Sequence, residues 1–193
     1  HADILSFELS LFGKRILVNG GTSEYEKSIT RYRERSTSSH NTVEINGLNS
    51  SEVWDSFRVA KRAYPKNLKI KRLKNLVQVS CSHDGYSNYK KKLIHNRKWI
   101  LKKRSLIIED SVDGYFDSAF AFYHFHPSIK IKKKGSNNFL IYHDTNNQIN
   151  VNVEFGKVKT IKTLYAAKFG SKCKRNSLKI IFLENKIRFK ISW

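Results

Sequence analysis

The chain has 193 residues, which is enough for a single domain with one sizeable hydrophobic core. Its 37 lysines and arginines against 16 aspartates and glutamates give a formal net charge of +21, so we expect a polyanionic partner: a nucleic acid, an acidic polysaccharide or a membrane surface. An AT-rich genome, which favours Lys, Asn and Ile codons, would account for part of this composition. No apolar run is long enough to cross a bilayer, so no membrane-spanning segment is expected.

Alternation of apolar and polar residues dominates from the amino terminus onward. Residues 4–12 carry leucine and phenylalanine at every second position, as a half-buried strand does. Residues 22–39 are polar and irregular, which predicts a long loop or a short helix between two strands. Residues 42–47 alternate again and end in Asn46 and Gly47, a pair that favours positive φ and a tight hairpin turn.

The remainder of the chain repeats the strand pattern, with short connections made of turn residues. Further strands are predicted at residues 52–62, 74–82, 91–101, 105–112, 118–126, 139–144, 148–155, 163–170, 178–183 and 186–193. About a dozen strands with little helix predict an all-β fold, a large antiparallel β-sandwich formed by residues 1–193 as one domain. Cys81 and Cys173 match no zinc or redox spacing, and the sequence leaves open whether they are two thiols or one disulfide.

Four stretches, taken in order, resemble the C-terminal β-domain of the heparinase II/III-like polysaccharide lyases. They are "HADILSFELSLFGKRILVNGGTSEY", "RSTSSHNTVEINGLNSSEVWDSFRVAKRA", "SHDGYSNYKKKLIHNRKWILKKRSLIIEDSVDG" and, more weakly, "YHFHP". The resemblance is to members associated with surface-polysaccharide or lipopolysaccharide genes, and it implies the periplasm or cell envelope of a bacterium. Full-length members of this family have a helical toroid before the β-domain. Because the chain opens on His1 and contains no methionine, we expect it to be a fragment that lacks this toroid.

The resemblance also implies a zinc site made by His1, Asn19 and His40. Two imidazoles suit zinc, whereas an uncharged amide oxygen is a weaker ligand than the aspartate usual at the position of Asn19. Asp3, two residues after His1, is a candidate for orienting a ligand or replacing one. The residues alone allow a second interpretation, in which His40 caps the following strand through neighbouring hydroxyl groups.

Four further residues are candidates for substrate binding. Arg35 and Arg97 offer paired donors to a carboxylate or sulfate group. His83 and Tyr86 belong to the "HDGY" motif, where a role for His83 in stabilising the turn is favoured over substrate contact. The nearby pair His124 and His126 shares a strand face with phenylalanines, which predicts packing histidines.

The function implied by the resemblance is cleavage of uronic-acid-containing glycans by β-elimination. That reaction removes a proton α to a carboxylate, so it needs cationic or hydrogen-bonding groups on the carboxylate, a base and a proton donor for the leaving oxygen. The catalytic residues are not assigned, and we expect the fragment alone to be inactive. The alternative is a non-catalytic module that binds acidic glycans. Nucleic-acid binding is disfavoured because no recognised nucleic-acid-binding motif is present.

Overall fold

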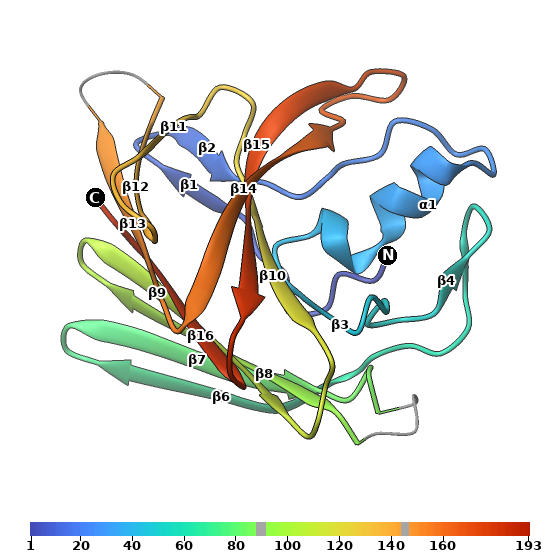
Figure 1. Cartoon of the computed structure of the whole chain (residues 1–193), viewed down its shortest axis with the longest axis horizontal. Helices are drawn as coiled ribbons and strands as arrows, with labels where there is room; N and C mark the ends of the chain where they lie inside the picture. Colours follow the sequence, from blue (N-terminus) through green and yellow to red (C-terminus); the bar gives the residue numbers. More distant parts are fainter. Residues whose placement is uncertain (88–91, 144–146) are drawn as a thin grey trace.

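The computed structural model describes residues 1–87, 92–143 and 147–193, and these residues form mostly antiparallel β-structure (Figure 1). One α-helix, α1 (Ile29–Arg35), and one 3-10 helix, η1 (Thr37–Ser39), lie between the second and third strands. The strands are β1 (Leu9–Leu11), β2 (Lys14–Leu17), β3 (Val43–Ile45), β4 (Val53–Trp54), β5 (Arg58–Val59), β6 (Pro65–Leu73), β7 (Leu76–His83), β8 (Ile94–Lys102), β9 (Ser105–Asp113), β10 (Ala119–His124), β11 (Lys130–Lys133), β12 (Asn138–Tyr142), β13 (Gln148–Glu154), β14 (Gly156–Tyr165), β15 (Cys173–Phe182) and β16 (Lys186–Ser192).

Two sheets form the sandwich. The larger has eight strands in the order β11-β12-β13-β16-β9-β8-β7-β6, and the smaller has four in the order β14-β15-β10-β3. Two short hairpins, β1-β2 and β4-β5, complete the architecture. Helix α1 lies at the side of the sandwich near the amino terminus (Figure 1). The predicted all-β sandwich is therefore confirmed.

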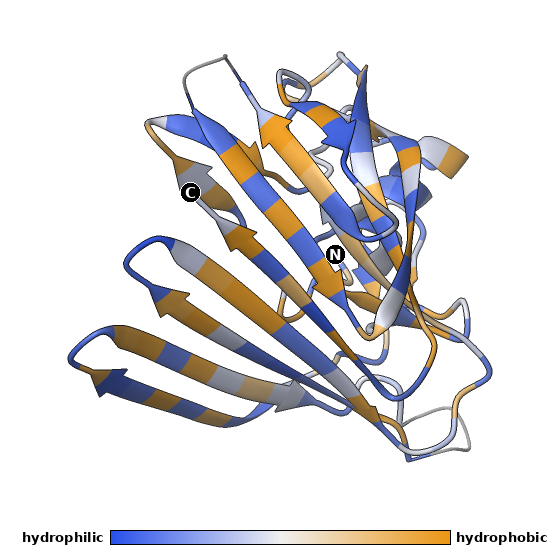
Figure 2. Ribbon diagram, turned by 60° about the vertical axis from the view of Figure 1, so that its left-hand side comes forward, coloured by the Kyte–Doolittle hydropathy of each residue, from blue (hydrophilic) through white to orange (hydrophobic). Residues whose placement is uncertain are grey.

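The core is made by the alternating inward side chains of both sheets, and Figure 2 shows the resulting stripes of apolar and polar residues along the strands. From the large sheet, Ile108, Phe189 and Val151 are buried, and Ala121 and Ile180 face them from the small sheet. Each fully buried large aliphatic or aromatic side chain contributes about 1.5–3 kcal/mol through the hydrophobic effect. Period-two alternation thus sets both the strands and the face that each strand buries.

The large sheet extends beyond the small one. Every residue of β6 is exposed, and neither β6 nor β7 contributes to the described hydrophobic core. The four-stranded sheet has too few strands to cover all eight of its partner, so β6 is exposed on both faces, whereas β7 is half-buried and its last three residues are buried. Strand β6 was not predicted because its lysines alternate with only a few apolar residues.

Several local predictions are confirmed and others are corrected. The polar segment 22–39 does contain a short helix, capped by the Ser28 hydroxyl, which accepts a hydrogen bond from the Arg31 N–H at 2.9 Å. Asn46 and Gly47 have φ of 54° and 67°, as the tight turn requires. The strand predicted over residues 4–12 is wrong in extent: only Leu9–Leu11 is a strand, and the chain turns at Leu5, whose φ is 57°.

Two other predicted strands also differ in extent from those observed. Residues 52–62 form the short β4-β5 hairpin, and only the first three of residues 163–170 belong to a strand. Residues 91 and 144, at the ends of two predicted strands, lie outside the described residues. Both cysteines are free: Cys81 is buried and Cys173 is exposed. Across the described ranges, no helix has the length and apolar character needed to traverse a bilayer.

Candidate functional site

His40 is a buried histidine whose ring has no hydrogen-bond partner. It follows η1, its backbone N–H donates to the Thr37 carbonyl at 3.1 Å, and its side chain is only 3% exposed. Among the described residues, neither Nδ1 nor Nε2 has a partner in hydrogen-bond geometry, although the nearby Glu34 backbone raises the pKa of the ring slightly against the effect of burial. Burial lowers the pKa of His40 to about 4, so the ring is neutral at pH 7 and carries a free lone pair. The predicted alternative, a hydrogen-bonded strand cap, is not what the structure contains.

His1 lies directly beside His40. The two ring centroids are 5.3 Å apart and the rings are tilted by 56°. The segment after His1 is tied to the His40 segment, because Ala2 donates its N–H to the Arg35 carbonyl and accepts a hydrogen bond from the Thr37 hydroxyl. The structure thus brings together two imidazoles that are far apart in the sequence.

Asn19 lies beside the residue that follows His40, and its amide oxygen is already engaged there. Its Oδ1 accepts a hydrogen bond at 3.2 Å from the backbone N–H of Asn41, the residue after His40. Its own N–H donates to Glu8, and its carbonyl accepts from Arg175. The third predicted ligand is therefore adjacent to His40 in space, although its amide oxygen now supports the backbone.

Asp3 is the carboxylate whose charge acts on the pKa of His40. It opposes the influence of burial by raising the pKa of His40, and it lines a pocket of about 390 Å³ together with His1 and Arg62. The chain as described contains no group of three or more His, Cys, Asp or Glu residues arranged to hold a metal ion. The unpartnered lone pair of the neutral His40 ring and the adjacent ring of His1 nevertheless fit two of the ligands that zinc takes.

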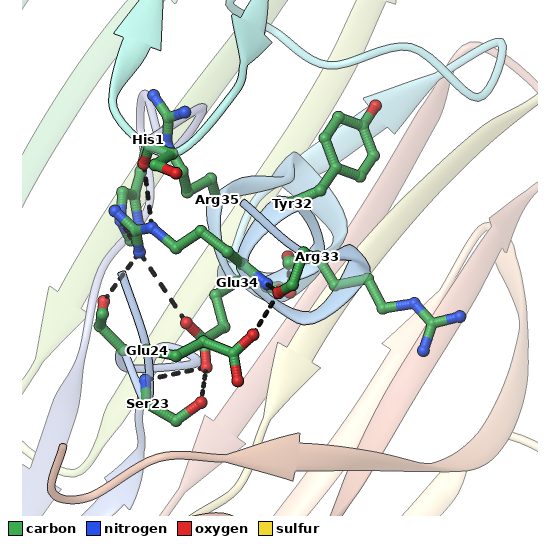
Figure 3. A network of polar contacts seen from close by, with 12 residues as sticks. His1, Ser23, Glu24, Tyr32, Arg33, Glu34 and Arg35 are labelled. Carbon is green, nitrogen blue, oxygen red and sulfur yellow. Dashed lines mark hydrogen bonds and ion pairs between the residues drawn. The ribbon is translucent and has the colours of Figure 1, made fainter. Parts of the chain in front are cut away.

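A polar network supports His1 from the side of α1 (Figure 3). Arg31 places Nη1 at 3.4 Å from Nε2 of His1 and at 3.8 Å from Glu34, and its Nε donates to the Ser56 carbonyl. Glu34 in turn accepts hydrogen bonds from the Ser23 hydroxyl and N–H. Sequence reasoning missed this network. The signal available was the spacing of three between Arg31 and Glu34, which places them on one face of a helix.

Asn41, the central residue of "HNT", was also not predicted as a functional residue, and it forms hydrogen bonds to three separate segments of the chain. Its side-chain nitrogen donates to the Phe7 carbonyl at 2.8 Å, and its side-chain oxygen accepts the His124 N–H at 2.7 Å. Its carbonyl accepts from Arg97 at 2.6 Å. All its polar groups are thus engaged, which fixes the backbone on the carboxyl side of His40.

The two predicted substrate-binding arginines lie in the interior. Arg35 is 2% exposed and donates to the carbonyls of Trp54, Asp55 and Arg58. Arg97 is 1% exposed and forms a bidentate ion pair with Asp110, with contacts at 2.6 and 2.9 Å. Both side chains support the fold, and their contact with substrate stays a prediction.

His83 and Tyr86 are buried as well. His83 accepts the Gly85 N–H on Nδ1 at 3.1 Å, as expected for a residue that stabilises its turn. Tyr86 is 0% exposed and donates its hydroxyl hydrogen to the Val43 carbonyl at 2.6 Å. Substrate contact by these two residues also stays a prediction. The packing role predicted for His124 matches its stacking on Phe122.

Comparisons with known proteins agree with this architecture. Solved structures with the same fold include the "Heparinase III-BT4657 gene product", with a TM-score of 0.79 and 17% identity, and the heparan sulfate lyase HepC from Pedobacter heparinus, with a TM-score of 0.80 and 14% identity. Each match covers 100% of this chain and 30% of the other, so the chain spans less than a third of those proteins. No curated protein matches the sequence.

A family model supplies the remaining comparison. The model described as "Heparinase II/III-like, C-terminal" matches residues 1–193, the whole of the chain. The likeness to the solved structures shows the fold, and the family match agrees with the order of motifs in the sequence. The chain belongs to the heparinase II/III-like family, as its C-terminal β-domain.

Proposed function

We propose that the chain is the β-sandwich domain of a polysaccharide lyase that cleaves acidic, uronic-acid-containing glycans by β-elimination. The observation that carries the proposal is His40, a buried imidazole with no hydrogen-bond partner among the described residues, next to His1. Buried polar groups are nearly always hydrogen-bonded, so a ring left without a partner points to a ligand. The net charge of +21 favours an acidic substrate, and the two similar structures are named as a heparinase and a heparan sulfate lyase.

Each residue of the site has a distinct task in this proposal. His40 offers a neutral nitrogen because burial keeps its pKa at about 4, and His1 offers a second nitrogen from the pocket wall. Arg31 restricts the position of the His1 ring, and Asn41 and Thr37 fix the backbone around His40. Zinc bound by His1, His40 and Asn19 would supply positive charge next to the pocket, and the Asn19 oxygen would have to exchange its hydrogen bond from Asn41 for the metal.

Zinc titration of the chain by calorimetry tests the ligand set. We expect stoichiometric binding to the unmodified chain and loss of binding in His40→Ala. The matched control is His126→Ala, because the hydrogen bonds of the His126 ring are local, to Ser128, and do not involve His1 or His40. Equal zinc affinity in all three proteins would contradict the assignment of His40 as a ligand.

Cleavage is tested with the chain extended to the full reading frame that encodes it. Heparan sulfate, alginate and bacterial surface glycans are incubated with this protein, with and without zinc, and the ultraviolet absorbance of the unsaturated product is followed. Absence of product with every uronic-acid polymer would overturn the lyase proposal. Binding of an acidic glycan without cleavage would instead support the non-catalytic module, which the engaged amide of Asn19 favours.

We also propose the periplasm or cell envelope of a bacterium as the location. The support is the sequence resemblance to members of the family associated with surface polysaccharides. Fractionation of the source cells, followed by detection with an antibody against the chain, tests this location. Recovery in the cytoplasmic fraction alone would contradict it.

A further inference from the structure

A second pocket lies between the α1–η1 segment and the small sheet. Its volume is about 400 Å³, within the range of small-molecule sites. Helical residues Arg33, Glu34 and Ser38 form one wall, and β10, β14 and β15 form the other with His124, Lys162, Thr163 and Arg175 among their residues. We call it the Arg175 pocket. It shares no lining residue with the pocket that contains His1.

Arg175 is a buried guanidinium without a carboxylate partner among the described residues. It is 2% exposed, its Nε donates to the Thr163 hydroxyl at 3.1 Å, and its Nη1 donates to the carbonyls of Val18 and Asn19 at 2.8 and 2.9 Å. Within the described structure, Nη2 forms no hydrogen bond. Burial lowers the pKa of Arg175 to about 10, which leaves it charged at pH 7. A buried charge without a counter-ion is costly, so an anion that pairs with it is stabilised.

The other charges around the pocket add to this positive potential. Arg33, Lys162 and Lys172 stand at its rim, and all are exposed. In Figure 3 the Arg33 side chain extends away from the network around His1. Lys162 donates to Asn176, and Lys172 lies 3.4 Å from Glu24, so only one rim cation has a carboxylate close by.

One carboxylate lines the pocket, and it is already engaged elsewhere. Glu34 accepts hydrogen bonds from Ser23 through one oxygen, and its other oxygen lies 3.8 Å from Arg31. Its charge is therefore directed toward the His1 side and does not neutralise Arg175. The balance of charge in the Arg175 pocket remains positive.

His124 neither adds charge nor blocks the pocket. Its Nε2 lies 3.0 Å from the Ser38 carbonyl, which can only accept, so Nε2 carries the hydrogen. Its Nδ1 then accepts from the Ser177 hydroxyl at 2.8 Å. Burial, followed by the charge of Arg175, holds the pKa of His124 well below its usual value, so the ring stays neutral.

We propose that the Arg175 pocket binds an oxyanion, the sulfate or carboxylate group of one unit of an acidic glycan. Arg175 pairs with the anion at the base of the pocket, and the rim cations and hydroxyl groups complete its coordination. The choice of a glycan as the source of the anion rests on the proposed function, whereas the anion site itself rests only on the charges and hydrogen bonds described above.

Inorganic sulfate is the probe for this site. Its affinity for the chain is measured from the rise in melting temperature with sulfate concentration, at constant ionic strength set with sodium chloride. We expect saturable stabilisation by sulfate, and affinity about tenfold weaker in Arg175→Gln, because one charge-assisted contact is lost. Acetate in place of sulfate, and a sulfated disaccharide against its unsulfated counterpart, identify which anionic group is preferred.

If Arg175→Gln does not fold, a variant of the exposed cations at the pocket rim still tests whether the pocket binds sulfate. The double variant Arg33→Ala/Lys162→Ala removes two exposed cations, and we expect affinity for sulfate to fall about threefold per cation. The matched control is Lys130→Ala/Lys132→Ala, which removes two exposed lysines from β11 on the large sheet. Stabilisation by sulfate no greater than by chloride, or equal affinity in the rim and control variants, would overturn the proposal.

The two proposals fail separately. Sulfate affinity is measured without any cleavage, so a protein that cleaves glycans but does not prefer sulfate or acetate to chloride would refute the Arg175 pocket alone. A protein that binds sulfate through Arg175 but releases no unsaturated product would refute the lyase alone.

Discussion

This domain contains two pairs of neighbouring histidines, and they differ in how their nitrogens are used. In the pair His83–His95, every ring nitrogen has a partner: Gly85 donates to His83, His83 to His95 at 3.0 Å, and His95 to Asp110 at 2.8 Å. In the pair His1–His40, both nitrogens of His40 are without a partner in the described structure. The first arrangement stabilises the fold, and the second leaves the lone pair of the neutral His40 ring available to a ligand.

The pairs also differ in their charged neighbours. Asp110 is 1% exposed and balances Arg97, and that guanidinium, together with the hydrogen bonds, holds the pKa of Asp110 well below its usual value against the effect of burial. Around His40 the carboxylate of Asp3 is exposed and lies in the pocket with His1. Polar groups that serve stability are thus closed off, whereas those of the candidate site border a cavity.

The largest expected effect comes from removing the charge that closes the first network. In Asp110→Asn, Arg97 becomes a buried charge without a counter-ion, so we expect the free energy of unfolding to fall by about 3–5 kcal/mol. Urea denaturation followed by circular dichroism measures this loss.

The control for Asp110 is its neighbour in the same strand. Glu109 forms its ion pairs with Lys98 and Arg188 at the surface, and Glu109→Gln should cost about 1 kcal/mol or less. A comparable loss in both variants would show that the buried network is not the source of the difference.

The same substitution in each pair tests their contrast directly. His95→Leu removes the hydrogen bonds that join His95 to His83 and to Asp110, and we expect a loss of about 3 kcal/mol. His40→Leu removes no hydrogen bond and should change the free energy of unfolding by about 1 kcal/mol or less in the absence of metal. Equal losses, measured by urea denaturation in a chelating buffer, would contradict the distinction between the pairs.

The sequence predicted the sandwich because period-two alternation is a local signal, and it indicated His1, Asn19 and His40 through their likeness to a family. It could not show that Arg35 and Arg97 are buried, since a guanidinium suited to a carboxylate substrate is equally suited to carbonyls and to Asp110. Those contacts join residues that are distant in the sequence, so they depend on strand pairing.

Stability should also depend on pH through the first pair. Burial lowers the pKa of His83 and His95 below the value of about 6.5 that histidine has in the unfolded chain. Their contribution is therefore fully present above pH 6.5 and is lost as the pH falls toward the folded pKa, because the unfolded state binds more protons. Each histidine adds a slope of about 1.4 kcal/mol per pH unit below that point.

Urea denaturation at pH 7 and pH 5.5 measures this slope. The unmodified chain should lose stability between the two values, and His83→Gln should lose less because one titrating group is gone. The same slope in both proteins would mean that His83 is not kept neutral by the fold.

The smallest effect expected is that of Tyr86→Phe, which tests a residue predicted from its motif to bind substrate. The Tyr86 hydroxyl donates to the Val43 carbonyl at 2.6 Å inside the core, where its ring also lies against His83. Loss of this hydrogen bond should lower the free energy of unfolding by about 1 kcal/mol. Because the side chain is 0% exposed, glycan binding by the folded variant, measured by calorimetry, should equal that of the unmodified chain. A loss of glycan affinity with unchanged stability would instead show that Tyr86 contacts the substrate.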